Sequence, residues 1–302
     1  MNCFPSRNVF IEGPDCSGKT TLIKNLHRET GYRWHITDRC QISRSIFNNL
    51  YRRDIKRADD DLHLELFDLN NRFIVLLPPA SSIVERFLSR GDELHDINSL
   101  RDVYHAFVSF VKKIENLPNV LVVKSAIDEM TLTKVCIEFL NRVESASIPE
   151  VGDAIVRSVA ASPEHEIFPL QFSIYDNGDF ISASSDILSY EPESEYYLSI
   201  MNSLMEKIDN ELKGKNEYNR VEDLSSRRFV YSDNTCISFI QASNRKEQMD
   251  FHAVIRSSDV ENIFKYDLKF LYYLASLCWN KIGINCKSAR MRININSAHF
   301  VK

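Results

Sequence analysis

The stretch Val9-Phe-Ile-Glu-Gly13-Pro-Asp-Cys-Ser-Gly18-Lys19-Thr20 decides the expected fold of the first half of the chain. From Gly13 onward it fits the pattern G-x-x-x-x-G-K-[ST], which is typical of a loop whose backbone N–H groups surround the phosphates of a nucleotide. An apolar strand precedes this loop and a helical segment follows it, as the pattern requires. The sequence therefore predicts a phosphate-binding loop between a buried strand and a helix.

The polar residues of this loop have distinct expected roles with ATP. Gly13 and Gly18 let the backbone turn around the phosphates, and Lys19 supplies a positive charge. The Thr20 hydroxyl is an expected ligand of Mg²⁺. The other phosphate contacts within the loop are expected from Asp15, Ser17 and Thr21.

Apolar stretches and helical stretches alternate through the first half of the chain. This order favours a parallel sheet flanked by helices, which is an α/β fold. The small and polar stretch 144–152 is expected to link two domains, residues 1–147 and 148–302. The second domain mixes strands and helices without strict alternation, which favours an α+β fold. The expected strands are 8–12, 73–77, 119–124, 170–175, 228–231, 236–242 and 252–255, and the expected helices begin at residue 19 or cover 82–89, 131–143, 196–212 and 267–281.

Length and composition agree with two globular domains. The chain has 302 residues, 44% of them hydrophobic, and no apolar run approaches the roughly 20 residues needed to cross a membrane. The first residues lack an apolar leader, so we expect the protein in the cytoplasm, or in the host cytoplasm if it is viral. Seven cysteines without paired spacing are expected to be reduced thiols. The net charge of −5 disfavours sequence-blind binding to nucleic acid.

Three stretches of the first half resemble the thymidylate kinase and deoxynucleoside kinase family. Residues 11–21 match the loop I-E-G-x-D-x-x-G-K-[ST]-T, residues 38–43 are similar to the D-R-x-x-x-S element, and residues 85–93 are similar to the lid. The resemblance implies a nucleoside monophosphate kinase that uses ATP and Mg²⁺. One departure is the short gap of about 18 residues between Thr20 and Asp38, which leaves the phosphate acceptor open.

The resemblance assigns roles to four charged residues. Asp38 would join Thr20 at the metal ion, and Arg39 would act as a catalytic residue beside Lys19. Arg86 and Arg90 would neutralise charge on the transferred phosphoryl group, although two arginines one turn apart are also typical of a plain helix surface. The charge-dense run 51–61 has the same two interpretations, and the solvated helix face is the favoured one.

A second set of reactive and polar residues begins at Cys236. Gln241, Arg256, Ser257, Asp259 and Asp267 follow it at offsets of 5, 20, 21, 23 and 31. This ungapped spacing resembles the thymidylate synthase superfamily, in which a nucleophilic cysteine precedes the nucleotide-binding residues. Two flanking elements are also similar to that family. In Ser226-Arg227-Arg228 the resemblance implies that the arginines reach the phosphate bound by the partner of a homodimer. In residues 296–301 it implies that His299 holds the sugar hydroxyl.

The chemistry of this set is addition of a thiolate to C6 of a pyrimidine, which makes C5 nucleophilic. Cys236 would be the thiolate, and Arg256 would lower its pKa while binding the nucleotide phosphate together with Ser257. For Asp259 the alternatives are a catalytic-site role, which its R-S-x-D context favours, and a loop or cap aspartate.

Asp267 stands where thymidylate synthases have asparagine. An ionised carboxylate can only accept hydrogen bonds, which suits the 4-amino group of cytosine. In this the chain resembles the phage dCMP hydroxymethylases, which use methylenetetrahydrofolate. Asp267 also opens an apolar helix, so N-capping is an alternative or additional role.

Some expected parts of that family have no clear counterpart. The chain ends at Lys302, where the family continues with a segment that closes over the folate. Glu164 or Glu166 is the candidate for the acid that orders water, and Arg157 is the candidate for a further phosphate arginine. Three hypotheses remain: a phage-encoded homodimeric kinase fused to a dCMP hydroxymethylase, a kinase with a nucleotide-binding or dimerising module, and an enzyme whose second domain is a thymidylate synthase acting on dUMP.

Overall fold

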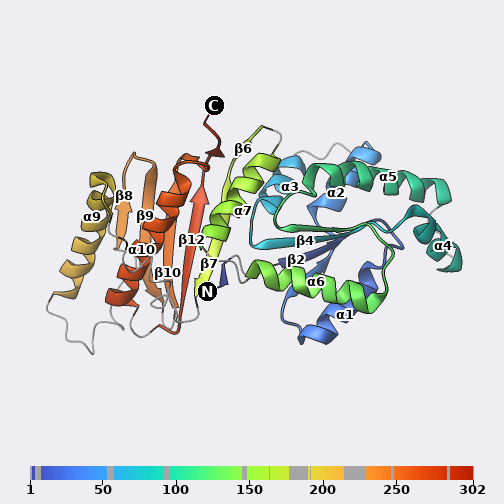
Figure 1. Cartoon of the computed structure of the whole chain (residues 1–302), viewed down its shortest axis with the longest axis horizontal. Helices are drawn as coiled ribbons and strands as arrows, with labels where there is room; N and C mark the ends of the chain where they lie inside the picture. Colours follow the sequence, from blue (N-terminus) through green and yellow to red (C-terminus); the bar gives the residue numbers. More distant parts are fainter. Residues whose placement is uncertain are drawn as a thin grey trace. The chain divides into compact units, whose positions relative to one another are not determined.

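The chain divides into two compact units. We refer to Ser6–Glu144 as the first unit and to Met1–Pro5 together with Ser145–Lys302 as the second unit (Figure 1). The sequence placed residues 1–5 in the first domain, whereas β1 (Asn2–Cys3) pairs antiparallel with β7 (Leu170–Asp176) of the second unit. The computed structural model describes residues 2–3, 8–52, 58–90, 96–144, 148–162, 164–176, 190, 192–213, 229–245, 248–283 and 286–301.

The first unit contains a four-stranded parallel sheet with the order β3-β2-β4-β5. Its strands are β2 (Asn8–Glu12), β3 (His35–Asp38), β4 (Asn71–Leu76) and β5 (Val120–Val123). Since all four run in the same direction, their carboxyl ends share one edge, where ligands of open α/β sheets bind. This is the α/β architecture expected from the sequence.

Helices cover both faces of this sheet. Figure 1 shows α1 and α6 on one side of the strands and α2, α3 and α5 on the other. The helices of the first unit are α1 (Lys19–Thr30), α2 (Gln41–Leu50), α3 (Ala58–Leu66), α4 (Ala80–Arg90), α5 (Ile97–Ile114) and α6 (Glu129–Glu144).

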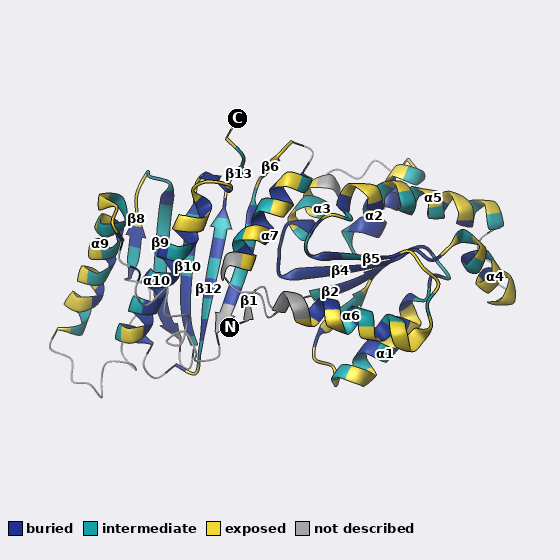
Figure 2. Ribbon diagram, in the orientation of Figure 1, coloured by how far each residue is buried: buried dark blue, intermediate teal, exposed yellow. Residues whose placement is uncertain are grey.

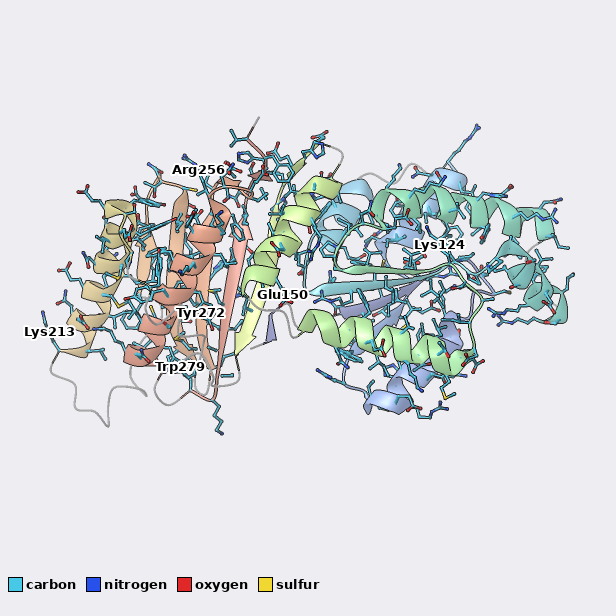
Figure 3. The ribbon with its side chains drawn as sticks, viewed as in Figure 1. Lys124, Glu150, Lys213, Arg256, Tyr272 and Trp279 are labelled. Atoms are coloured by element: carbon cyan, nitrogen blue, oxygen red, sulfur yellow. The ribbon has the colours of Figure 1, made fainter. Side chains whose placement is uncertain are left out.

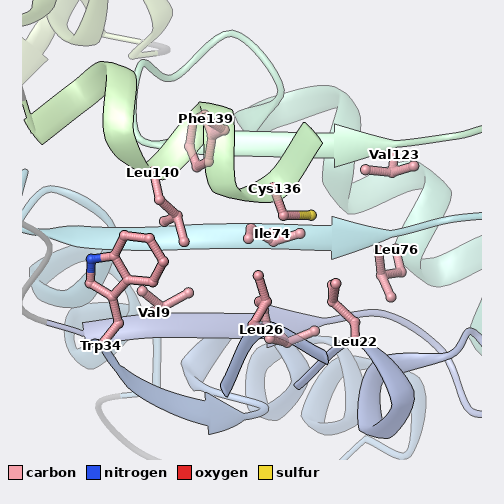
Figure 4. Packing of buried hydrophobic residues seen from close by; sticks show 11 residues of the cluster. Val9, Leu22, Leu26, Trp34, Ile74, Leu76, Val123, Cys136, Phe139 and Leu140 are labelled. Carbon is pink, nitrogen blue, oxygen red and sulfur yellow. The ribbon is translucent and has the colours of Figure 1, made fainter. Parts of the chain in front are cut away.

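Buried side chains at helical spacing fix α1 and α6 to the strands (Figure 4). Leu22 and Leu26 lie one turn apart on α1, and Cys136 and Leu140 lie one turn apart on α6; all four are at most 1% exposed. Burial raises the pKa of the Cys136 thiol to about 12, which makes it an unreactive core residue. These contacts fix the two helices to the strands that lead into the phosphate loop.

The charge-dense run was expected to be a solvated helix face. Its residues 53–57 lie outside the described residues. Asp60 and Asp61 are exposed on α3, which agrees with that interpretation.

The second unit contains a six-stranded mixed sheet with the order β1-β7-β12-β10-β9-β8. Strands β10 and β12 are parallel, whereas the other neighbours are antiparallel. With its helices this gives the expected α+β architecture. The other strands of this sheet are β8 (Val230–Ser232), β9 (Ile237–Arg245), β10 (Gln248–Ile255) and β12 (Ser288–Ile295), and the helices described in this unit are α7 (Ile148–Ala161), α9 (Glu195–Leu212) and α10 (Phe264–Ile282).

Burial alternates along the strands of this sheet (Figure 2). On β12 the buried residues Ala289 and Met291 alternate with the partly buried Arg290 and Arg292. Helix α10 packs on β9, β10 and β12, and α9 packs on β8. The apolar row thus faces helices, and the polar row lies on the opposite face.

The expected linker 144–152 is wrong for most of its length. Helix α6 continues to Glu144 and α7 begins at Ile148, while residues 145–147 lie outside the described residues. Proline is tolerated in a first helical turn, and Val151 and Ile155 are fully buried one turn apart. None of the helices in the described part of the chain combines the length and apolar character that a membrane crossing needs.

Candidate functional site

The phosphate loop lies between β2 and α1, as expected. Gly13 has φ of 139°, and a Cβ atom there would lie 2.3 Å from the backbone oxygen of Leu76, so a larger residue would not fit. Gly18 caps α1 with φ of 102°. Both glycines therefore adopt backbone conformations that other residues avoid.

Lys19 is folded into this loop and is only 7% exposed. Its Nζ donates to the backbone oxygens of Gly13 and Pro14, both at 2.9 Å. Burial lowers the pKa of Lys19, and the nearby carboxylates of Asp15 and Asp38 oppose that shift. Phosphate oxygens are stronger acceptors than these neutral carbonyls, so a phosphate in the loop would compete with them for the ammonium group.

The Ser17 hydroxyl gives independent evidence for a ligand. Its Oγ atom is buried and has no hydrogen-bond partner among the described residues. Leaving a buried polar group unpaired costs about 1–3 kcal/mol, so such atoms usually mark a missing partner. A phosphate oxygen in the loop would satisfy it.

Arg39 follows β3 and reaches the loop. Its Nη2 donates to Asp15 Oδ1 at 2.6 Å, and its guanidinium lies over the ring of Phe47, 5.5 Å from the centroid. Asp38 ends β3 in register with Ile11, so it sits beside the strand that leads into the loop. The D-R element is therefore brought to the same edge of the sheet as the phosphate loop.

Thr20 and Asp38 are the expected metal ligands. Thr20 lies in the first turn of α1 and both residues are exposed. No group of three or more His, Cys, Asp or Glu side chains that could hold a metal ion occurs within the described ranges. Mg²⁺ commonly takes one or two protein oxygens and completes its shell with other ligands and water, so the oxygen donors of these two side chains are of a type that suits this ion.

The two lid arginines have different positions. Arg86 on α4 donates from Nη1 to the backbone oxygens of Ser17 and Cys16, at 3.2 and 3.4 Å. Arg90 lies one turn further along the same helix and is exposed. The structure therefore brings Arg86 to the loop, and the plain-surface interpretation remains for Arg90.

A cavity of about 300 Å³ opens beside the loop. It lies between α1, α4 and the segment that enters α6, and it is bordered by polar and apolar groups. Thr21, which was expected to contact phosphate, lines this cavity beside the loop. The lining residues are Ser17, Gly18, Thr21, Leu22, Asn25, Arg86, Ile127, Glu129 and Leu132.

Sequence reasoning missed several residues around the loop. Asn25 lies one turn after Thr21 on α1, so helical spacing could have found it. Ile127 and Glu129 come from more than a hundred residues away, and no local signal points to them. Glu12 was noted only as part of a motif, yet it is fully buried and accepts three hydrogen bonds from the start of α2.

In the second unit, Cys236 lies immediately before β9 and beside the end of β10. Its Sγ donates to the backbone oxygen of Ser257 at 2.7 Å, and the Arg256 backbone N–H donates to the Cys236 oxygen at 2.8 Å. Arg256 lies at the end of the sheet where β10 finishes (Figure 3). Three of the expected site residues are thus adjacent.

The expected activation of Cys236 is not present in this state. Burial raises the pKa of the Cys236 thiol, and the neighbouring Asp267 carboxylate raises it further. Arg256 acts in the opposite direction but is the smallest of the causes. Because Arg256 is exposed, water screens its charge and the expected lowering of the pKa is outweighed.

Asp267 is 1% exposed and lies in the first turn of α10. The cap residue of this helix is Ile263, so the N-capping interpretation of Asp267 is wrong. Instead, Asp267 Oδ1 accepts from the Tyr197 hydroxyl at 2.7 Å. Burial raises the pKa of Asp267 to about 6, against hydrogen bonds from Tyr197 and Ser258 that lower it.

Asp259 is held by its own loop. Its Oδ1 accepts from the backbone N–H groups of Glu261 and Asn262 at 3.2 and 3.3 Å, and its Oδ2 accepts from the Asn262 amide at 2.9 Å. The bonds from Asn262 hold the pKa of Asp259 below its ordinary value. This geometry agrees with the loop-aspartate alternative.

A small sheet places further candidates together. It has the order β11-β13-β6, formed by β11 (Ser258–Asp259), β13 (Ala298–His299) and β6 (Glu166–Ile167). His299 pairs with both Asp259 and Glu166, and the Ser297 hydroxyl bridges Glu166 Oε1 at 2.6 Å and His299 Nδ1 at 3.2 Å. Of the two acidic candidates, Glu166 is therefore the one beside His299.

One expected residue, Gln241, is not brought to Cys236. Gln241 lies five residues further along β9, and a strand rise of about 3.3 Å per residue separates the two by roughly 16 Å. Arg157 lies on α7. Arg227 and Arg228 lie outside the described residues.

Comparisons with known proteins find likenesses only among solved structures. No family model matches the chain, and no curated protein matches it. Among solved structures it is similar to a deoxyadenosine kinase from M. mycoides with bound dCTP, at 14% identity and a TM-score of 0.33, covering 45% of this chain and 99% of that one. A score this low carries no functional argument, so function is argued below from the sites themselves.

Proposed function

We propose that the first unit is an ATP-dependent kinase that phosphorylates a nucleotide, with a pyrimidine (deoxy)nucleoside monophosphate as the acceptor class. The observation that carries this proposal is the convergence of Lys19, Arg39 and Arg86 on one phosphate loop. Phosphoryl transfer needs little covalent chemistry from the protein, but it needs cations placed where negative charge develops.

The residues divide the work between the two sides of the loop. Lys19 and the loop N–H groups would hold the phosphates of ATP, and the neighbouring cavity would receive the rest of that nucleotide. Arg86 would shield the γ-phosphate from the α4 side. Thr20 and Asp38 would hold Mg²⁺, which neutralises charge on the phosphate oxygens.

We infer that the acceptor binds on the side of Arg39 and Asp15. Because only residues 31–34 separate α1 from β3, no helix lies between them to build a nucleoside pocket. The acceptor site would instead use the start of α2, where Arg39 is anchored. This supports an abbreviated acceptor site.

Formation of ADP from ATP and Mg²⁺, measured with a panel of nucleoside monophosphates, tests this proposal. Lys19→Ala should lower turnover by a factor of at least about 100, because a buried cation at the transferred group is lost. Lys24→Ala is the matched control, since Lys24 is exposed on the same helix. Turnover that is insensitive to Lys19→Ala would exclude the loop as the site of phosphoryl transfer.

A second activity is favoured by the cluster around Cys236. We propose that the second unit transfers a one-carbon unit to C5 of dCMP, with methylenetetrahydrofolate as the donor. The supporting observation is that the buried Asp267 carboxylate, which accepts from the Tyr197 hydroxyl through Oδ1, lies close enough to the Cys236 thiol to raise its pKa. An acceptor-only carboxylate suits the 4-amino group of cytosine.

Ligand binding would also change Cys236. When a 4-amino group donates to Asp267, the negative charge of the carboxylate is partly neutralised, and its effect on the thiol weakens. The thiolate could then add to C6, and C5 would attack the donated carbon. Loss of the C5 proton and departure of tetrahydrofolate as the leaving group would give an exocyclic methylene. Addition of water to that carbon, with elimination of the Cys236 thiolate, would complete hydroxymethylation.

Release of tritium from C5-labelled dCMP or dUMP separates the remaining hypotheses. Release from dCMP that Cys236→Ala abolishes supports hydroxymethylation, whereas release from dUMP supports a thymidylate synthase. No release from either base supports a kinase whose second unit only binds nucleotide or dimerises. Asp267→Asn should shift the preference toward dUMP, and an unchanged preference would contradict the role of Asp267.

We also propose that the second unit forms a homodimer through its six-stranded sheet. Helices cover one face, while the opposite row, which includes Phe239, His252 and Arg292, is only partly buried. A half-covered sheet face of mixed polarity fits a second copy of the chain. Light scattering after gel filtration should give twice the mass of 35.0 kDa, and Arg292→Glu should shift it toward the monomer.

A further inference from the structure

The backbone of Arg39 is in a strained conformation. Its φ is 70°, in the left-handed region that residues with a Cβ atom rarely occupy. Such conformations persist only where the surrounding structure holds them, and they cluster at functional sites. The contacts that hold Arg39 therefore bear on how its guanidinium is aimed.

Two successive backbone N–H groups at this point are tied to the last residues of β2. The Arg39 N–H donates to the Ile11 oxygen at 3.1 Å, and the next N–H, that of Cys40, donates to Glu12 Oε1 at 2.6 Å. The peptide that follows Arg39 is thus fixed by a buried carboxylate that directly precedes the phosphate loop.

Glu12 makes this anchor rigid. Its Oε1 also accepts from the Ser43 N–H at 3.2 Å, and its Oε2 accepts a short hydrogen bond from the Ser43 hydroxyl. Burial raises the pKa of Glu12, and the bonds to Ser43 and Cys40 oppose that rise. A fully buried carboxylate with three donors has little freedom to move.

The other end of Arg39 points back to the same loop. The guanidinium donates to Asp15, which lies three residues after Glu12. The backbone of Arg39 and its side chain are therefore tied to the two sides of Gly13, with Glu12 on one side and Asp15 on the other.

We propose that Glu12 is a positioning residue for phosphoryl transfer: through the Cys40 N–H and Ser43 it holds Arg39 so that its guanidinium faces the phosphate loop. This rests on the proposed kinase function. A simpler role, support of the α2 N-terminus, competes with it, because Ser43 and Cys40 belong to that end of the helix.

Glu65 provides a matched control for the simpler role. It accepts from the Gln41 N–H at 2.8 Å, so it supports the same helix end without touching the peptide bond that follows Arg39. Glu12→Gln and Glu65→Gln each remove one carboxylate charge from this end. If support of the helix were the whole role of Glu12, the two variants would have similar kinetics.

If Glu12 positions Arg39, Glu12→Gln should lower kcat about tenfold or more, because the charge-assisted bonds from Cys40 and Ser43 weaken. The KM for ATP should change less than about twofold, because the phosphate loop stays intact. Glu65→Gln should keep kcat near the wild-type value. In an Arg39→Gln background, Glu12→Gln should have little further effect. Equal losses in the two single variants, or additive losses in the double variant, would overturn the proposal.

A measurement without turnover separates this inference from the kinase proposal. In protein labelled with ¹⁵N-arginine, the Nε signal of Arg39, assigned with Arg39→Gln, should shift in Glu12→Gln and stay in place in Glu65→Gln. An unmoved signal in Glu12→Gln refutes positioning even if the enzyme is active. A wild-type protein that forms no ADP with any acceptor refutes the kinase function, whatever the signal does.

Discussion

At the scale of single residues, Asp267 shows how burial sets the pH dependence of stability. Its pKa rises from 3.8 to about 6 on folding. Between these values the folded chain holds a proton that the unfolded chain has lost, so stability falls as the pH rises through this window. Above about pH 6 the folded chain carries a buried carboxylate that costs on the order of 2–3 kcal/mol.

Asp267→Asn should therefore stabilise the second unit at pH 7.5 relative to the wild type, by roughly 2 kcal/mol, and have little effect at pH 4. Asparagine keeps an oxygen for the Tyr197 hydroxyl, so the geometry is conserved. Urea unfolding at the two pH values measures the difference. A difference that is the same at both pH values would show that Asp267 does not titrate in this window.

Cys236 gives a second prediction at this scale. Asp267 raises the pKa of the thiol and Arg256 lowers it. At pH 7.5 Asp267→Asn should speed alkylation by iodoacetamide and Arg256→Gln should slow it, each by about two- to tenfold, because only the thiolate reacts. Mass spectrometry of the peptide that contains Cys236 follows this site alone. Rates that move together in the two variants would contradict the electrostatic account.

The residues that sequence could place are those whose role is local. Gly13, Ser17 and Lys19 belong to one short loop, so the sequence motif alone predicts that they lie close together. Gln241 had the expected spacing from Cys236, yet extended backbone carries it away along β9. The pKa of Cys236 depends on burial and on Asp267, which a linear pattern does not contain.

At the scale of elements, the helices and strands that the sequence predicted well are those with a clear local pattern of apolar residues. Strand β2 and helices α1 and α9 were expected nearly to the residue, because apolar periodicity marks them. The first residues of α7, 148–152, were taken as part of a linker, because Pro149 and Gly152 are typical of loops. Only tertiary burial of Val151 and Ile155 shows the inner face of this helix. Strands β3 and β13 are too short for a pattern.

Helix α1 offers a test of the core described above. Leu26 is fully buried in the cluster that joins α1, α6 and the sheet. Leu26→Ala should destabilise the first unit by about 3 kcal/mol, because the removed methyl groups leave a cavity. Lys24→Ala on the exposed face of the same helix should have almost no effect. Calorimetry compares them, and equal midpoints in the two variants would contradict this packing.

At the scale of the whole molecule, the two units should respond separately to ligand and to truncation. Saturating ATP should raise only the unfolding temperature of the first unit, since binding stabilises the unit that holds the ligand.

Deleting residues 1–5 should lower only the unfolding temperature of the second unit, because β7 loses its neighbour β1. Each lost hydrogen bond should cost about 1 kcal/mol. Calorimetry resolves both, and a single transition that follows both changes would contradict separate units.

The pairing of β1 with β7 also affects the order in which the two units can fold during translation. The first strand of the second unit emerges before any of the first unit, and its neighbour emerges only after Leu170 has been made. The first unit can form its core while the chain is still being synthesised. The second unit must bring β1 and β7 together across the whole of the first unit's sequence. Residues 2–3 therefore have no strand partner until β7 has been synthesised.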